Sequence, residues 1–290
     1  MRVTIEVGTP GTAELVAVVA ALRQWQRDDA PIQLHPGDLG WYWRFGPRAT
    51  AAATRTWRAQ GELVAIGLLD EPEVLRLAFS PQAWRDEEVT QRVVTDLVDP
   101  GRGVLPTGKV SVEAPTGARV PDLLSDLGWS AGEPWTPLRH DLTGVMDHPG
   151  LRVEVIRPGR EPDYAAVHRS AFDSPRFTDD RWREMAAGEP FADARCLLGY
   201  DERGVAVAEV TVWSAGPGRP GLLEPMGVHA AHRGRGHGRS ICLAAAAELK
   251  ALGASSALVC TPSSLVGAVA TYRAAGFRPL PERVDRVREA

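Results

Sequence analysis

The sequence has little lysine, little cysteine and no long apolar run, and each shortage excludes a class of protein. Lysine occurs only at Lys109 and Lys250, so nearly all of the positive charge is arginine, spread along the chain among acidic residues. The formal net charge is −4, and the chain has no concentrated basic face of the kind that binds nucleic acid. We therefore expect no nucleic-acid partner.

The cysteines and the apolar runs exclude further classes. Cys196, Cys242 and Cys260 all lie in the second half, at spacings unlike those of metal ligands, so a disulfide framework is not expected. The longest apolar runs are too short to cross a bilayer, and the first ten residues alternate like a strand instead of forming a signal-peptide core. We expect no membrane partner and a cytoplasmic location.

The two halves of the sequence predict nearly the same order of strands and helices. In the second half we expect strands at 151–156, 195–201, 205–213, 222–229 and 256–260, and helices at 161–172, 179–188, 239–252 and 265–275. The first half repeats the order, with strands at 3–7, 54–59, 62–69, 74–80 and 109–114 and helices at 12–25, 86–98 and 120–128. We predict an α/β fold with a mixed sheet in each half, domains at 1–145 and 151–290, and a linker at Leu142–Gly150.

Residues His232–Ser240, HRGRGHGRS, place three glycines and three arginines between a predicted strand and a predicted helix. Glycine exposes backbone N–H groups and arginine attracts anions, while the N-terminus of a helix adds a positive end. The segment therefore predicts a site for a phosphate-bearing ligand, with added charge from Arg233, Arg235 or Arg239. A solvated basic loop is the alternative, and the closely flanking strand and helix count against it.

Two other phosphate motifs do not fit. A dinucleotide fingerprint needs G-x-G-x-x-G and a later acidic residue, whereas this loop reads G-x-G-x-G and the next strand end has no acid. The nearest Walker A match, Gly103–Val110, places valine where the metal-binding hydroxyl belongs and continues into a strand. The glycine loop therefore needs another interpretation.

The loop segment RGRGHG fits R-x-x-G-x-G and resembles motif A of the GNAT superfamily of N-acetyltransferases, which transfer acyl groups from acyl-CoA. Downstream, LVGAVATYRAAGFRPL is similar to the closing motif of that family, N-x-x-A-x-x-x-Y followed by G-F. Its matching residues are Ala268, Tyr272, Gly276 and Phe277, while Leu265 stands at the asparagine position. The resemblance covers residues 151–290, and the first half matches only in layout.

The resemblance implies a tandem, two-domain acyltransferase whose second domain moves an acetyl group from acetyl-CoA to an amine of a small molecule by direct attack. No metal is implied. The alternative is a non-catalytic acyl-CoA-binding or regulatory protein, which Leu265 favours. The residues implied to bind the donor are Met226, Gly227, Val228, Arg233, Gly234, Arg235, Gly236, His237, Gly238, Arg239 and Ser240.

Two residues are candidates for proton transfer. Strand alternation predicts that Glu224 shares a face with Met226 and Val228, where its carboxylate could act as the base. A structural acid is the alternative. The resemblance implies that Tyr272 protonates the departing thiolate, and the alternative there is a core aromatic residue.

Other reactive side chains are better explained by structure than by chemistry. His229, His232 and His237 lack orderly metal spacing and a nearby acid. Cys260 has no histidine close in sequence to activate it, so core packing is expected. Trp41 lies in a tryptophan-rich stretch that either lines a substrate cleft or buries the first domain's surface.

The first half lacks the residues that would form an acyl-CoA donor site. Aligning the two halves places Trp84 at Arg233 and Leu75 at Glu224, and the carboxylates of residues 86–88 fall on the glycine loop. Those carboxylates suit a helix start but repel a pyrophosphate. Counting back from the closing glycines places Leu124 at Tyr272 in the same way. We therefore expect a degenerate first domain without a donor loop.

Overall fold

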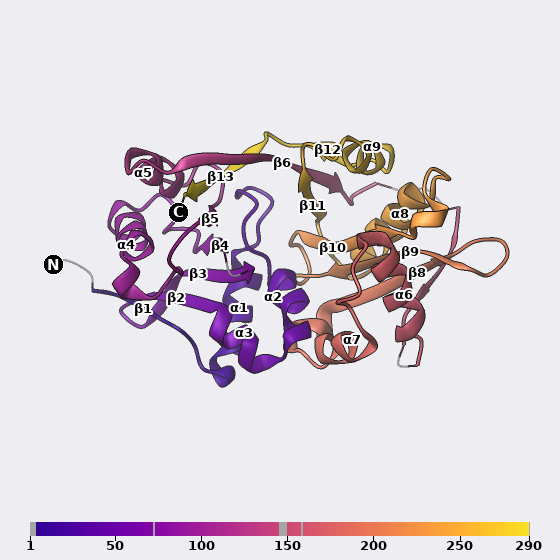
Figure 1. The fold of residues 1–290 in the computed structure, drawn as a ribbon, viewed down its shortest axis with the longest axis horizontal. Helices are drawn as coiled ribbons and strands as arrows, with labels where there is room; N and C mark the ends of the chain where they lie inside the picture. Colours follow the sequence, from indigo (N-terminus) through magenta and orange to yellow (C-terminus); the bar gives the residue numbers. More distant parts are fainter. Residues whose placement is uncertain (1–3, 72, 145–149, 158, 290) are drawn as a thin grey trace.

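The two halves of the chain lie side by side, and each places helices on both faces of a sheet (Figure 1). The computed structural model describes residues 4–71, 73–144, 150–157 and 159–289. The first half contains β1 (Ile5–Gly8), α1 (Leu15–Trp25), α2 (Pro36–Tyr42), α3 (Pro47–Ala53), β2 (Thr54–Ala59), β3 (Glu62–Glu71), β4 (Val74–Phe79), α4 (Glu87–Val98), β5 (Val110–Glu113), α5 (Val120–Asp126) and β6 (Ser130–Asp141).

In the described residues the second half follows a similar order, with two helices in place of three between its first two strands and one short strand added before its last. It contains β7 (Arg152–Val155), α6 (Glu161–Phe172), α7 (Asp179–Ala186), β8 (Ala194–Tyr200), β9 (Ala206–Trp213), β10 (Gly221–Val228), α8 (His237–Ala251), β11 (Ser256–Pro262), α9 (Val266–Ala274), β12 (Arg278–Pro279) and β13 (Arg283–Arg288). The predicted α/β class is confirmed. Of the predicted linker, residues 145–149 lie outside the described residues, and the domain limits stay a prediction.

The sheet is continuous across both halves, where we expected one sheet in each. Its order in the described residues is β1-β2-β3-β4-β5-β13-β6-β11-β10-β9-β8-β7, and β12 pairs with β6. The last strand of the chain, β13, thus lies between β5 and β6 of the first half. The long strand β6 pairs with β13 near its start and with β11 from Trp135 onward, so it crosses from one half to the other (Figure 1). The last strand of each half, β6 or β13, therefore pairs with a strand of the other half.

Apolar side chains fill both faces of each half. In the first half, one cluster joins the sheet to α4 and α5, and a second joins it to α1 and α2. In the second half, α8 and α9 cover one face, and α6 and α7 cover the other. No helix in the described ranges is long and apolar enough to span a membrane.

Helix α2 of the first half packs on the sheet of the second half. Gly37 and Gly40 lie against the indole ring of Trp213, and a Cβ atom at either glycine would overlap that ring. His35 is the N-cap of α2, and its Nδ1 accepts a hydrogen bond from the backbone of Gly37 at 2.9 Å. Its other ring nitrogen donates to the carbonyl of Pro220 at 3.2 Å, at the start of β10. This packing brings first-half side chains to the edge of β10.

Candidate functional site

The strand before the glycine loop separates from its neighbour β11. The parallel pairing of β10 and β11 consists of Gly221 with Ala257 and Leu222 with Leu258, and it ends there. Further along β10, the backbone of His229 donates to Val207 of β9 at 2.9 Å. Because alternate residues of an antiparallel strand face opposite edges, the backbone groups of residues 226 and 228 face the gap toward β11. The residue between them, Gly227, faces β9.

In the first half, the matching edge is filled by the chain itself. Leu77 and Phe79 of β4 correspond to Met226 and Val228 in the alignment of the halves. The carbonyl of Leu77 accepts a hydrogen bond from the backbone of Leu34 at 3.2 Å, and the Phe79 N–H donates to Gln33 Oε1 at 3.0 Å. Segment 33–34 therefore occupies the edge that is open in the second half.

The glycine loop leads directly into helix α8. Gly234 and Gly236 have φ values of 75° and 82°, a backbone region that suits glycine, and a Cβ at either position would meet nothing within 4 Å. Gly236 is the N-cap of α8 and provides no side-chain acceptor for the first-turn N–H groups. The counterpart α4 differs, because Asp86 caps it by accepting from the backbone of Val89 at 2.9 Å. The expected carboxylates therefore do lie at the start of α4.

The arginines of the loop have different environments. Arg233 donates to the carbonyl of Ala171 at the end of α6, at 2.6 Å, and Arg239 donates to the carbonyl of Ala274 at the end of α9, at 2.9 Å. Both side chains thus bind helix C-termini, where a positive charge is favourable. Arg235 has no hydrogen bond or ion pair with any residue that the structure describes. Of the three arginines, it is the one best placed to meet a ligand.

Gly238 makes room for the neighbouring helix α9. A Cβ there would lie 2.8 Å from Thr271 Cγ2 of α9 and 3.5 Å from Val228 Cγ2. The glycine therefore allows α8 to approach α9 closely. Burial, with nearby His232 and Arg235, lowers the pKa of His237, which begins α8. No group of three histidine, cysteine or acidic residues within the described ranges could hold a metal ion.

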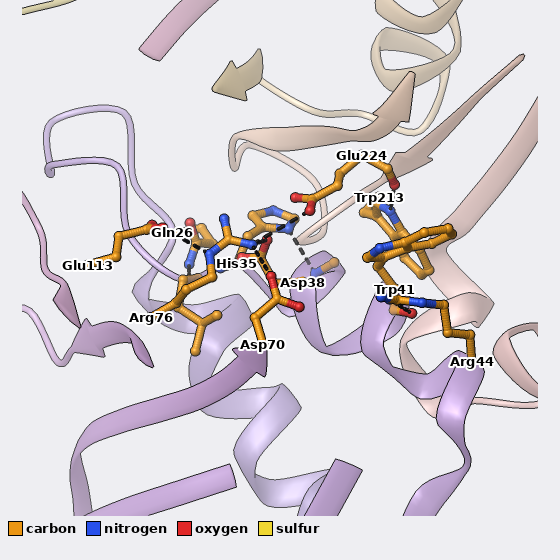
Figure 2. Close-up of polar contacts among 12 residues, drawn as sticks. Gln26, His35, Asp38, Trp41, Arg44, Asp70, Arg76, Glu113, Trp213 and Glu224 are labelled. Carbon is orange, nitrogen blue, oxygen red and sulfur yellow. Dashed lines mark hydrogen bonds and ion pairs between the residues drawn. The ribbon is translucent and has the colours of Figure 1, made fainter. Parts of the chain in front are cut away.

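Glu224 does not share a face with Met226 and Val228, and that prediction was wrong. The register of β10 against β9 shifts between Leu223 and Met226, which breaks the simple alternation. Leu223, Met226 and Val228 pack in the cluster beneath α8, whereas the Glu224 carboxylate points toward the first half (Figure 2). Its Oε1 lies 3.6 Å from Nη1 of Arg76 on β4. The carbonyl of Glu224 accepts a hydrogen bond from Trp213 Nε1 at 2.6 Å.

Tyr272 lies on α9 and is 6% exposed. Its ring meets Phe277 edge-on at a centroid distance of 5.9 Å, and its hydroxyl has no hydrogen-bond partner among the described residues. Burial raises the pKa of Tyr272 well above its usual range, and Cys242, Glu209 and Glu224 add to the effect. The hydroxyl therefore stays protonated near neutral pH. Burial also raises the pKa of Cys260, which keeps that thiol protonated and disfavours a nucleophilic role.

Comparison with known proteins assigns this geometry to a family. Residues 161–277 match the acetyltransferase (GNAT) family model. This part of the second half therefore belongs to the GNAT superfamily. No curated protein matches its sequence.

Solved GNAT structures share the fold over the whole chain. A tandem GNAT protein from the clavulanic acid biosynthesis pathway is 16% identical, with a TM-score of 0.62 over 99% of this chain and 98% of that one. A GCN5-related N-acetyltransferase from Sphaerobacter thermophilus is 18% identical, with a TM-score of 0.59 over 98% and 95%. An acetyltransferase of the GNAT family from Colwellia psychrerythraea is 15% identical, with a TM-score of 0.60 over 99% and 100%. The tandem fold predicted from the sequence is therefore confirmed.

Sequence reasoning missed the first-half residues beside the GNAT domain. Arg76, Asp38 and His35 all lie close to the start of β10, yet none was predicted. Trp41 was considered, and it lies between the halves, with its ring stacked on Phe177 at 5.1 Å and beneath Arg44 at 4.2 Å (Figure 2). The only signal in the sequence was a charged residue, arginine, within an otherwise apolar strand.

Proposed function

We propose that the second half transfers an acetyl group from acetyl-CoA to an amine of a small-molecule acceptor. The observation that carries this proposal is the gap beside β10. It offers an open backbone edge at residues 226 and 228, and the glycine turn and the uncapped start of α8 follow immediately. An extended amide-bearing arm fits such an edge, and a pyrophosphate fits the helix start. The two features have the order that acetyl-CoA requires.

The donor site then divides into two parts. Met226 and Val228 offer backbone groups to the pantetheine arm, and Gly227 lets α6 pack closely, because a Cβ there would lie 2.6 Å from Ala171 Cβ. The backbone N–H groups of residues 234–239 surround the pyrophosphate, and the Arg235 guanidinium adds charge. Arg233 and Arg239 support this loop by holding the ends of α6 and α9.

The chemistry needs one proton acceptor and one proton donor. Acetyl-CoA supplies a thioester whose carbonyl carbon the amine attacks directly, so the C–N bond forms as the C–S bond breaks. Glu224 accepts the proton that the amine nitrogen loses. Tyr272 gives its hydroxyl proton to the leaving sulfur.

We further propose that residues 1–145 act as a domain without a donor site. Segment 33–34 saturates the β4 edge, and Asp86 occupies the start of α4. Leu75 and Leu124, which stand at the positions of Glu224 and Tyr272, are fully buried and carry no proton-transfer group. The first half instead contributes side chains to the acceptor side of the second.

One observation favours a second function, an acyl-CoA-binding protein without turnover. Leu265 is the N-cap of α9, is 53% exposed, and provides no polar side chain at the position where the family has asparagine. Thiol release from acetyl-CoA, measured with a panel of primary amines, separates the two functions. Release that depends on an amine, with an acetylated product, supports transfer. Tight binding of acetyl-CoA without release under any amine would establish the second function.

A further inference from the structure

Arg76 lies at the centre of four carboxylates that come from both halves. Its side chain is 14% exposed. Its Nη1 lies 2.8 Å from Asp38 Oδ1 and 3.3 Å from Asp70 Oδ2, and its Nε donates to Glu113 Oε2 at 3.0 Å. The fourth contact, at 3.6 Å, is to Glu224 Oε1 on β10 (Figure 2). Glu224 is the only member of the cluster that comes from the GNAT domain.

The four carboxylates are not equivalent. Glu113 also pairs with Arg283, and although burial alone would raise its pKa, the two arginines bring it to about 2. Asp38 is 2% exposed, and burial together with the Glu224 charge raises its pKa well above the usual range, although Arg76 opposes the shift. Glu113 lies between Arg76 and Arg283 and so anchors the Arg76 guanidinium on the side away from Glu224.

Glu224 has the weakest hold on Arg76 and the best access to solvent. Its contact is the longest of the four, and its side chain is 28% exposed, against 2% for Asp38 and 8% for Glu113. Three shorter contacts, to Asp38, Asp70 and Glu113, hold the guanidinium independently of Glu224. A fixed cation beside a carboxylate orients it and favours its ionised form.

We propose that Arg76, a residue of the first half, is the positioning residue for Glu224. This inference rests on the proposed function. Arg76 holds the Glu224 carboxylate at the edge of the gap, and Glu224 takes the proton that the acceptor nitrogen releases. Arg76 transfers no proton itself. The first half thereby completes the reaction centre of the second, and Leu75, its neighbour on β4, is the residue that aligns with Glu224.

Other charged groups also face this carboxylate. Asp38 on α2, Asp70 on β3 and Glu113 on β5 surround Arg76, and Arg44 and Tyr272 interact electrostatically with Glu224. Removing the cation takes away the counterion that these acids share, and only Glu113 keeps another, Arg283. Deprotonation of the cluster then becomes less favourable. The acid limb of the pH profile of kcat/KM must then move to higher pH. A purely structural tie between the halves has no such effect.

The test compares Arg76→Met, Arg76→Lys and a control, Arg119→Met, in the full chain. Arg119 also pairs with a first-half carboxylate, Glu87 at 3.5 Å, on the opposite face of the first half. Amine-dependent thiol release is measured from pH 5 to 9. For Arg76→Met we expect kcat/KM for the amine to fall at least about tenfold, the acid limb to move to higher pH, and KM for acetyl-CoA to change less than about twofold. The control is expected to match the wild type.

Two further variants keep the result decisive. Arg76→Lys keeps the charge that the fold needs but not the two-pronged geometry, so a loss of kcat at an unchanged melting temperature supports positioning. In a Glu224→Gln background, Arg76→Lys should cause no further loss, because its target is absent. Additive losses, or an unchanged pH profile in Arg76→Met, overturn the proposal. A wild-type chain that binds acetyl-CoA but releases no thiol with any amine overturns the proposed function, and this inference with it.

Discussion

Single side chains decide whether the loop binds phosphate, and Arg235 is the most direct test. It has no described partner, whereas Arg233 is bound to the end of α6. A charge-assisted contact contributes about 1.5–3 kcal/mol, so Arg235→Ala should weaken acetyl-CoA binding at least about tenfold. Arg233→Ala should instead lower the melting temperature and affect binding less. Calorimetric titration and thermal unfolding measure the two effects. Equal affinity in Arg235→Ala and the wild type would remove Arg235 from the site.

A substitution of Tyr272 distinguishes its two possible roles, general acid and core aromatic residue. Tyr272→Phe keeps the ring that packs on Phe277 and removes the hydroxyl. We expect kcat to fall about 100-fold with acetyl-CoA affinity nearly unchanged, since general acid catalysis contributes about 10²–10⁴. Tyr200→Phe is the control, because it loses a hydroxyl bound to Arg160, remote from the gap. Wild-type turnover in Tyr272→Phe would leave the ring as a packing group alone.

His35 makes the stability of the interface depend on pH. Burial lowers its pKa from 6.5 to about 3, despite its bond to Pro220. The unfolded chain therefore binds a proton at pH values where the folded chain does not, and stability falls as the pH drops from 6.5 toward 3. Each unit in this window costs up to about 1.4 kcal/mol. Urea unfolding at several pH values should show a shallower dependence in His35→Gln than in the wild type, and parallel curves would contradict this account.

At the scale of one element, β13 offers a matched pair of valines. Val287 is 9% exposed, and a Cβ at Gly132 of β6 would lie 3.1 Å from it, whereas Val284 is 39% exposed. Val287→Asp buries a charge without a partner and should lower the free energy of unfolding by about 2–4 kcal/mol. Val284→Asp should cost less than about 1 kcal/mol.

The same two variants, Val287→Asp and Val284→Asp, also test whether β13 couples the unfolding of the two halves. Because β13 pairs with β5 and β6, its loss should destabilise both halves in one transition of the urea curve. Tryptophan fluorescence and circular dichroism should give the same midpoint for Val287→Asp. Separate midpoints, with the second half unaffected, would show that the shared strand does not couple the two halves.

For the whole molecule, the proposal that only the second half binds the donor predicts one tight acetyl-CoA site per chain. The β10 edge is open, and the β4 edge is filled by Gln33 and Leu34. Calorimetric titration of the full chain should therefore give a stoichiometry near one. In the Arg235→Ala variant the affinity of that single site for acetyl-CoA should fall. Two equivalent sites would show that segment 33–34 gives way to the donor.

Much of this arrangement could be predicted from the sequence, because the glycine loop, the closing motif and the strand order depend on local pattern. The shared strands could not. The sequence of β6 contains Gly132, Pro134 and Pro137, and β13 reverses the usual rule, with Arg283 and Asp285 buried while Val284 is exposed. Such strands are defined by the neighbours they acquire on folding.

The Arg76 cluster was missed for a related reason. Its carboxylates come from positions as distant as Asp38 and Glu224, so no local pattern connects them. Helix α2 was missed as well, because its glycines read as a loop and make sense only against Trp213. The face of Glu224 was predicted wrongly because a register shift leaves no trace in the alternation of residue types.

The place of β13 also determines when the chain can finish folding. Strand β5 ends at Glu113 and its neighbour β13 ends at Arg288, so roughly 175 residues are synthesised between them. At about 5–20 residues per second, the ribosome needs about 9–35 s for that stretch. Throughout this interval the edge of β5 is an unpaired template for other chains. The half that is made first is therefore the half that is completed last, and slower translation of the second half lengthens its exposure to aggregation.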